Sequence, residues 1–154
     1  MSATKRRLDF HTADEVIAEI DRLRTGGYDK LKNWNLTQNC EHLTATMLAG
    51  LEGMGTRMPR ILRVTVFRWI FAWMLRRRKM LSAPTAPELR PTSPGDTDDD
   101  AIIDRCIETL RRAAARDQPI DRHPLLENMP ATDWQQINYI HAAHHLGFLQ
   151  PNSH

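Results

Sequence analysis

The sequence predicts an all-α protein: an antiparallel helical bundle with a long proline-rich loop. Five segments carry apolar residues at helical spacing, and almost none alternates apolar and polar residues as a strand does. The connections are short except for one proline-rich stretch, and long helices with short connections favour an antiparallel bundle. The 154 residues fit one domain, 1–154, for which we expect an ordered core over about 7–151.

The first two predicted helices have clear start and stop signals. Thr12 and Glu15 have the spacing of a capping box, and the glycine pair at 26–27 ends the first helix. The second helix runs over about 37–51, carries an apolar stripe and is followed by Gly53. Both segments therefore have the length and patterning of helices that pack on a core.

The third predicted helix, 60–80, has apolar residues that wrap widely around it. Such a helix is either deeply buried or offers a second apolar face to a partner. Between Arg57 and Lys79 the sequence has eight basic and no acidic residues, interleaved with four aromatic ones: Phe67, Trp69, Phe71 and Trp73. Arginines and aromatics of this kind suit nucleic acid or an interfacial membrane helix. We favour a core helix whose arginines extend to water, because the aromatic residues follow the core side.

The rest of the chain contains a proline-rich loop and two more predicted helices. The proline-rich loop, 82–97, cannot be regular helix, and loops of this length are often functional. The aspartates at 96–100 suit the N-terminus of a fourth helix. A fifth helix has a capping signal at Thr132 and ends near Gly147.

Composition narrows the function classes. The net charge of +2 is too small to indicate nucleic-acid binding by itself. The most apolar segment, 61–75, is shorter than the roughly 20 residues of a bilayer span, and no apolar run follows the basic N-terminus as in a signal peptide. Two cysteines make no disulfide framework, so we expect buried thiols and a cytoplasmic protein.

His141 and His145 are the strongest candidate site residues. Four residues apart on a helix, they lie about 40° apart around its axis and share a face, whereas His144 lies about 60° to the other side of His141. With His42 from the second helix they would make a three-histidine metal site with open positions. Alanines occupy positions 142 and 143, so the glutamate of a His-Glu-x-x-His protease is absent. The alternative is that these histidines pack in the core or face water.

Residues around His42 have alternatives of their own. Gln38 lies one turn earlier and either orients His42, contacts a ligand or is a surface residue at the helix start. Cys40 lies about 200° around the helix from His42, so it cannot easily share a metal with that residue. We therefore interpret Cys40 as a structural thiol.

Two stretches resemble a known family. Trp34-Asn35-Leu36-Thr37-Gln38-Asn39-Cys40-Glu41-His42-Leu43 resembles the opening of the second helix in the DinB/YfiT-like superfamily, where a Trp-x-Leu-x-Gln pattern leads to a metal-ligand histidine. His123-Pro124, Trp134 and His141-Ala142-Ala143-His144-His145-Leu146 resemble one uncharacterised branch with a His-x-x-His-His-Leu helix. That branch tends to have Phe-Gly after His-Pro, where this chain has Leu125-Leu126.

The resemblance implies a four-helix bundle with an extra element and a divalent metal, zinc or nickel, on His42, His141 and His145. It implies a metal-dependent enzyme that activates a thiol or water, as an S-transferase or hydrolase, with a small-molecule substrate such as a low-molecular-weight thiol. Candidate pocket residues are Trp34, Gln38, His144 and Trp134. The alternative is a non-catalytic helical binding or dimerisation protein that uses helix 60–80; we expect neither nucleic acid nor a membrane as partner.

Overall fold

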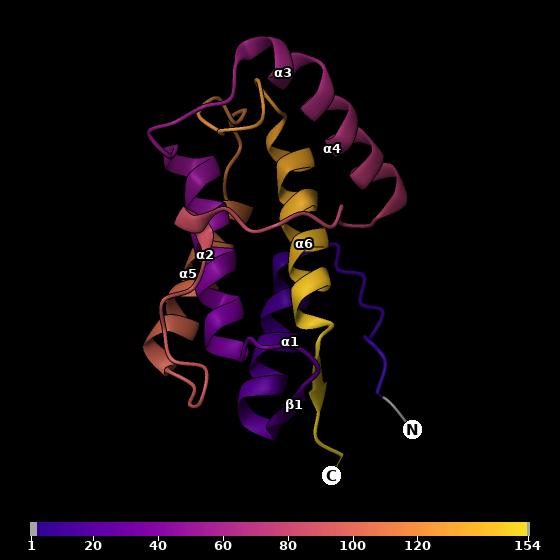
Figure 1. Cartoon of the computed structure of the whole chain (residues 1–154), viewed down its shortest axis with the longest axis vertical. Helices are drawn as coiled ribbons and strands as arrows, with labels where there is room; N and C mark the ends of the chain where they lie inside the picture. Colours follow the sequence, from indigo (N-terminus) through magenta and orange to yellow (C-terminus); the bar gives the residue numbers. More distant parts are fainter. Residues whose placement is uncertain (1–2, 154) are drawn as a thin grey trace.

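A computed structural model describes residues 3–153 and is mostly helical (Figure 1). The helices are α1 (Ala13–Gly26), α2 (Leu36–Glu52), α3 (Arg60–Val64), α4 (Val66–Arg77), α5 (Asp100–Ala114) and α6 (Ala131–Leu146). A 3-10 turn, η1 (Pro87–Leu89), lies in the proline-rich loop, and the strands β1 (Tyr28–Lys30) and β2 (Leu149–Pro151) pair antiparallel. Within the described residues no helix is both long and apolar enough to cross a membrane.

Local capping explains where α1 and α2 begin. Thr12 accepts a bond from the Glu15 amide while the Glu15 carboxylate accepts from the Thr12 amide, which confirms the predicted capping box. Asn35 and Gln38 form the same reciprocal arrangement before α2. Glycines in the left-handed region end both helices, since a residue without Cβ adopts that conformation without strain.

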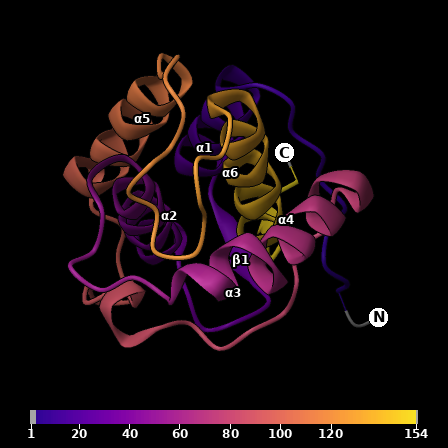
Figure 2. The ribbon, with the colours of Figure 1, turned by 90° about the horizontal axis from the view of Figure 1, so that it is seen from above.

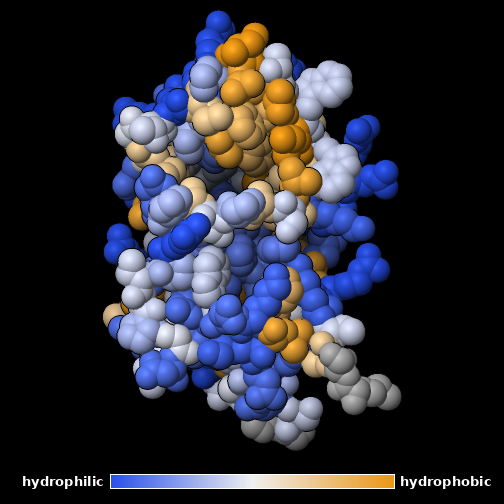
Figure 3. Space-filling view, viewed as in Figure 1, coloured by the Kyte–Doolittle hydropathy of each residue, from blue (hydrophilic) through white to orange (hydrophobic). Residues whose placement is uncertain are grey.

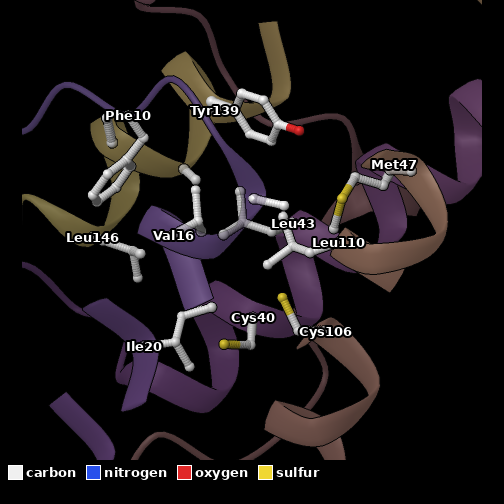
Figure 4. Close-up of a cluster of buried hydrophobic side chains, with 14 of the residues drawn as sticks. Phe10, Val16, Ile20, Cys40, Leu43, Met47, Cys106, Leu110, Tyr139 and Leu146 are labelled. Atoms are coloured by element: carbon white, nitrogen blue, oxygen red, sulfur yellow. The ribbon is translucent and has the colours of Figure 1, made fainter. Parts of the chain in front are cut away.

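The core lies between α1, α2, α5 and α6. Helix α2 packs against α5 and α6, and α1 packs against the same two helices (Figure 2). Figure 4 shows the buried side chains that fill the space between them, among them Val16, Ile20, Leu43, Leu110 and Leu146. Cys40 and Cys106 lie in this core as free thiols, as the sequence predicted.

The single third helix that the sequence predicts is divided. Thr65, with φ −117° and ψ −89°, interrupts it between α3 and α4, and its hydroxyl donates to the Ile61 carbonyl. A threonine hydroxyl that bonds one turn back competes with the helical ladder and bends the helix. The prediction that the aromatic residues follow the core is wrong for Trp69, which is 78% exposed, and for Trp73.

Two further details differ from expectation. The β1–β2 pair, with Asp29 opposite Gln150, makes the fold mostly helical rather than purely α-helical. Three-residue strands are too short to show an alternating pattern. Helix α6 begins at Ala131, after Pro130, instead of being capped by Thr132. The proline-rich loop is irregular apart from η1, as predicted, and in Figure 1 its first part crosses in front of α2 and α6.

Two contacts fix how α2 and α6 lie together. A Cβ atom on Gly50 would lie 2.5 Å from Trp134 Nε1, so only glycine allows the indole to pack there. His42 Nε2 lies 3.1 Å from His141 Nε2. His42 precedes Gly50 on α2, whereas His141 follows Trp134 on α6, so the two helices run antiparallel.

We predict that Gly50→Ala destabilises the protein. In an exposed helix this change would stabilise by about 1 kcal/mol through helix propensity. Here the methyl group meets a rigid, fully buried indole, and overpacking of this kind costs about 1–3 kcal/mol. Urea denaturation followed by circular dichroism measures the free energy of unfolding.

The control for this prediction is the same change in a Trp134→Leu background. With the indole removed, Gly50→Ala should no longer destabilise relative to the Trp134→Leu parent. Stabilisation by Gly50→Ala in the wild-type background would show that the indole does not need the space above Gly50.

Candidate metal centre

Helices α2 and α6 bring His42, His141 and His145 together. One ligand atom from each side chain lies within 4.8 Å of the others. His141 Nε2 lies 3.1 Å from His42 Nε2 and 3.0 Å from His145 Nε2. His42 comes from α2, and the other two come from successive turns of α6, as the i, i+4 spacing requires. The structure therefore contains a group of three histidines that could hold a metal ion.

A hydrogen bond to the main chain sets the protonation of His42. His42 Nδ1 lies 2.8 Å from the Leu89 carbonyl, which can only accept, so Nδ1 carries the proton. For His141 the shorter contact is that of its Nε2 with the unprotonated Nε2 of His42, at 3.1 Å, whereas its Nδ1 lies 3.4 Å from Thr46 Oγ1. The His42 Nε2 atom therefore has a free lone pair that faces His141 Nε2.

This arrangement fits a cation. Ring nitrogens that lie 3.0 to 3.1 Å apart could bind one cation in common. Histidines that bind metals usually donate their other ring N–H to a carbonyl or similar acceptor, as His42 does to Leu89. The hydrogen bond from His42 to the Leu89 carbonyl is therefore the one expected of a histidine that binds a metal.

Burial keeps the three imidazoles neutral. It lowers the pKa of His42, although the bond to Leu89 opposes the shift. Burial, helped by the His42 and His144 imidazoles, holds the pKa of His141 well below its usual value. Burial also lowers the pKa of His145 strongly, with His141 and His42 adding to it. Neutral imidazole is the form that binds a metal, so the site is in its binding form near pH 7.

Trp34 covers the histidines on one side. Its ring stacks on His145 with centroids 5.6 Å apart and planes 17° apart, and it tilts against His42 at 5.2 Å. Such packing restricts the orientations of both imidazoles.

A cavity of about 780 Å³ opens on the histidine group. Its walls include residues of α2 and α6, Phe71 of α4 and residues 80–86, the segment that crosses these helices in Figure 1. No aspartate or glutamate lines it among the residues that the structure describes. Figure 3 shows apolar side chains gathered over α3 and α4, above that segment. The cavity is large enough for a small organic molecule.

The structure separates the predicted pocket residues into two groups. Trp34, Trp134 and His144 line the cavity, whereas Gln38 does not. Gln38 Oε1 accepts from the Asn35 amide and its Nε2 donates to the Ser93 carbonyl at 3.0 Å. The Gln38 side chain thus caps α2 and attaches the proline-rich loop to it. It makes no hydrogen bond to His42.

Glu41 fastens the same loop. Its carboxylate accepts from the Thr92 amide and hydroxyl and from the Ser93 amide, at 2.8 to 3.1 Å. These bonds lower the pKa of Glu41 despite its partial burial. Because the same loop supplies the Leu89 carbonyl, Glu41 and Gln38 indirectly hold His42 in place.

Sequence reasoning missed several residues at the cavity. Thr46 lies one turn after His42, and Asn138 lies one turn before His141, so helical spacing alone places both near the histidines. His123 also lines the cavity; its Nδ1 accepts from the Leu125 amide, and burial lowers its pKa to about 4. The contact of the Leu89 carbonyl with His42 could not be predicted, because every residue has a backbone carbonyl.

We predict that Glu41→Ala weakens zinc binding about 10- to 100-fold, the usual effect of removing groups that orient a ligand. Without the carboxylate the loop loses three bonds, so the Leu89 carbonyl no longer fixes the His42 ring. Competition with a zinc chelator measures the affinity. Glu108→Ala, an exposed change on α5, is the control, and equal affinities for the two variants would contradict the role of the loop.

Comparison with known proteins places the chain in a family. No curated protein and no solved structure matches it. One family model, described as a protein of unknown function, DUF1569, matches residues 2–152. The match covers nearly the whole chain, including the three histidines. The chain therefore belongs to the DUF1569 family of proteins of unknown function.

Proposed function

We propose that this protein is a metal-dependent enzyme of the DinB-like kind, which transfers a thiol or hydrolyses a small substrate. One observation carries the proposal: His42 from α2 and His145 from the next turn of α6 each place Nε2 within 3.1 Å of His141 Nε2, at the wall of a large cavity. Three protein ligands with the remaining positions open to a cavity are typical of catalytic metal sites.

Zinc or nickel is the proposed metal. Neutral imidazole is a donor that both ions accept, and His42, His141 and His145 supply three such donors. Aspartate and glutamate, the donors that magnesium and calcium require, are absent from the described lining of the cavity. A divalent cation bound here would lower the pKa of a bound thiol or water and so provide a nucleophile near neutral pH.

The chain's own residues would bind and orient the substrate. Phe71, Trp134 and Ile137 form an apolar wall that excludes water. His123 accepts the Leu125 amide at Nδ1, so its Nε2 carries the proton and can donate to a substrate oxygen. Its pKa of about 4 keeps it neutral in this role near pH 7.

We also propose that α1, α2, α5 and α6 form the four-helix bundle of the DinB-like superfamily, with α3 and α4 as its extra element. The antiparallel α2–α6 pair and the packing of α1 and α5 against the same core support this assignment.

The test is the metal content of untagged protein. We expect about one zinc or nickel ion per chain by mass spectrometry. The His42→Ala, His141→Ala double variant should lose it while circular dichroism shows an unchanged helix content. His11→Ala, which removes an exposed histidine, is the control and should keep the metal. Wild-type protein without metal after incubation with zinc or nickel, or a double variant that retains full stoichiometry, would overturn the proposal.

A second candidate function is a binding protein that uses α3 and α4. Ile61, Val66, Trp69 and Trp73 are exposed there, and basic residues flank them. Two copies of this face would bring like charges together, whereas an anionic lipid surface would complement them. Exposed tryptophans beside arginines are typical of helices that lie in a membrane interface.

We predict for this candidate that the protein co-sediments with vesicles containing phosphatidylserine at low salt and is released at high salt. Trp69→Glu should abolish binding, because it places a negative charge at the centre of the face. Vesicles of phosphatidylcholine alone are the control. Absence of co-sedimentation at low salt would reject this second function and leave the metal-dependent enzyme unaffected.

A further inference from the structure

We infer that the substrate of the metal centre carries an acidic group, which Lys5 and Lys32 bind at the rim of the cavity beside His144 and Phe148. The inference rests on the proposed function, because it concerns the molecule that the metal centre acts on. It adds the chemical class of that molecule: a small organic acid that also offers an atom to the metal.

The two lysines converge on one aromatic ring. The Lys5 ammonium lies 4.5 Å from the centroid of Phe148, and the Lys32 ammonium lies 4.2 Å from it. Neither forms an ion pair with an aspartate or glutamate of residues 3–153. Partial burial and the Lys32 charge lower the pKa of Lys5, which agrees with two cations held close together. Like charges that act on each other in this way are stabilised by an anion that contacts both.

His144 adds a polar group to the same place. Its Nδ1 lies 2.9 Å from the Lys5 ammonium, which can only donate, so the proton of the neutral ring is on Nε2. The rim therefore offers two ammonium groups and one N–H donor.

The rim lies next to the metal ligands. The His144 ring centroid is 5.1 Å from that of His145 and 5.5 Å from that of Phe148. Phe148, Lys32 and His144 line the same cavity as His141 and His145. One small molecule can thus reach the lysines and the histidine group together.

A buried donor marks the other side of the histidines. Asn138 lines the cavity one turn before His141, is 7% exposed, and its Nδ2 has no hydrogen-bond partner. A buried amide without a partner is costly unless a ligand or water satisfies it. From Asn138 to Leu146, the last residue of α6, the helical rise covers about 12 Å.

These positions define a ligand. Its acidic group lies at Lys5 and Lys32, an atom between its ends faces the histidines, and a hydrogen-bonding group meets Asn138 beside the apolar wall of Trp134 and Ile137. The described lining holds no carboxylate that would repel such an anion.

The experiment compares matched thiols on zinc-loaded protein. Calorimetry measures the Kd of 3-mercaptopropionate and 6-mercaptohexanoate and of their uncharged counterparts, 3-mercaptopropanol and 6-mercaptohexanol, at low salt. We expect wild-type protein to bind at least one acid about tenfold more tightly than its alcohol. In the Lys5→Ala, Lys32→Ala variant this preference should fall below roughly threefold, while the alcohols keep their affinity. Arg105→Ala, which removes an exposed charge on α5, should retain the preference.

Metal content of the same samples separates the two hypotheses. Metal-loaded protein that binds acid and alcohol equally, or binds neither, overturns the inference, as does a preference that survives in the double lysine variant. Wild-type protein that holds no zinc overturns the proposed function and the inference with it. Zinc at full stoichiometry in the double lysine variant shows that the lysines act on the substrate and not on the metal.

Discussion

The antiparallel contact between α2 and α6 is the constraint on which the histidine group depends. At one end of the contact, the indole of Trp134 packs directly against Gly50, which has no Cβ atom to keep it away. About two turns away, the same pair of helices holds His42 against His141 and His145. The same interface therefore contains the close packing at Gly50 and the three histidines. The short distance between the helices at the glycine sets how closely the imidazoles approach.

The proline-rich loop completes what the helices begin. Helix α2 supplies His42, and Glu41 and Gln38 on the same helix hold the loop that returns the Leu89 carbonyl to that histidine. The helix and the loop therefore order each other. The segment before η1, residues 80–86, forms one wall of the cavity. The loop therefore both orients His42 and encloses the cavity beside it.

Sequence patterns predicted those parts of the fold and the site that have a helical period. The capping box at Thr12 and the stripe of α2 are local features, and the i, i+4 pair His141 and His145 follows from helix geometry alone. The break at Thr65 could not be predicted, because both halves keep the same apolar pattern. Lys5 and Phe148 are joined only by tertiary packing at opposite ends of the chain, so no local signal connected them.

The bond from His42 to the Leu89 carbonyl has a consequence for how this site tolerates change. A main-chain acceptor is present whatever side chain stands at position 89, so substitution there leaves the proton on His42 Nδ1 where it is. The location of this carbonyl depends instead on the number of residues in the loop. Insertion or deletion of a residue between Met80 and Thr92 would displace the acceptor, so the length of this loop is more tightly constrained than its composition.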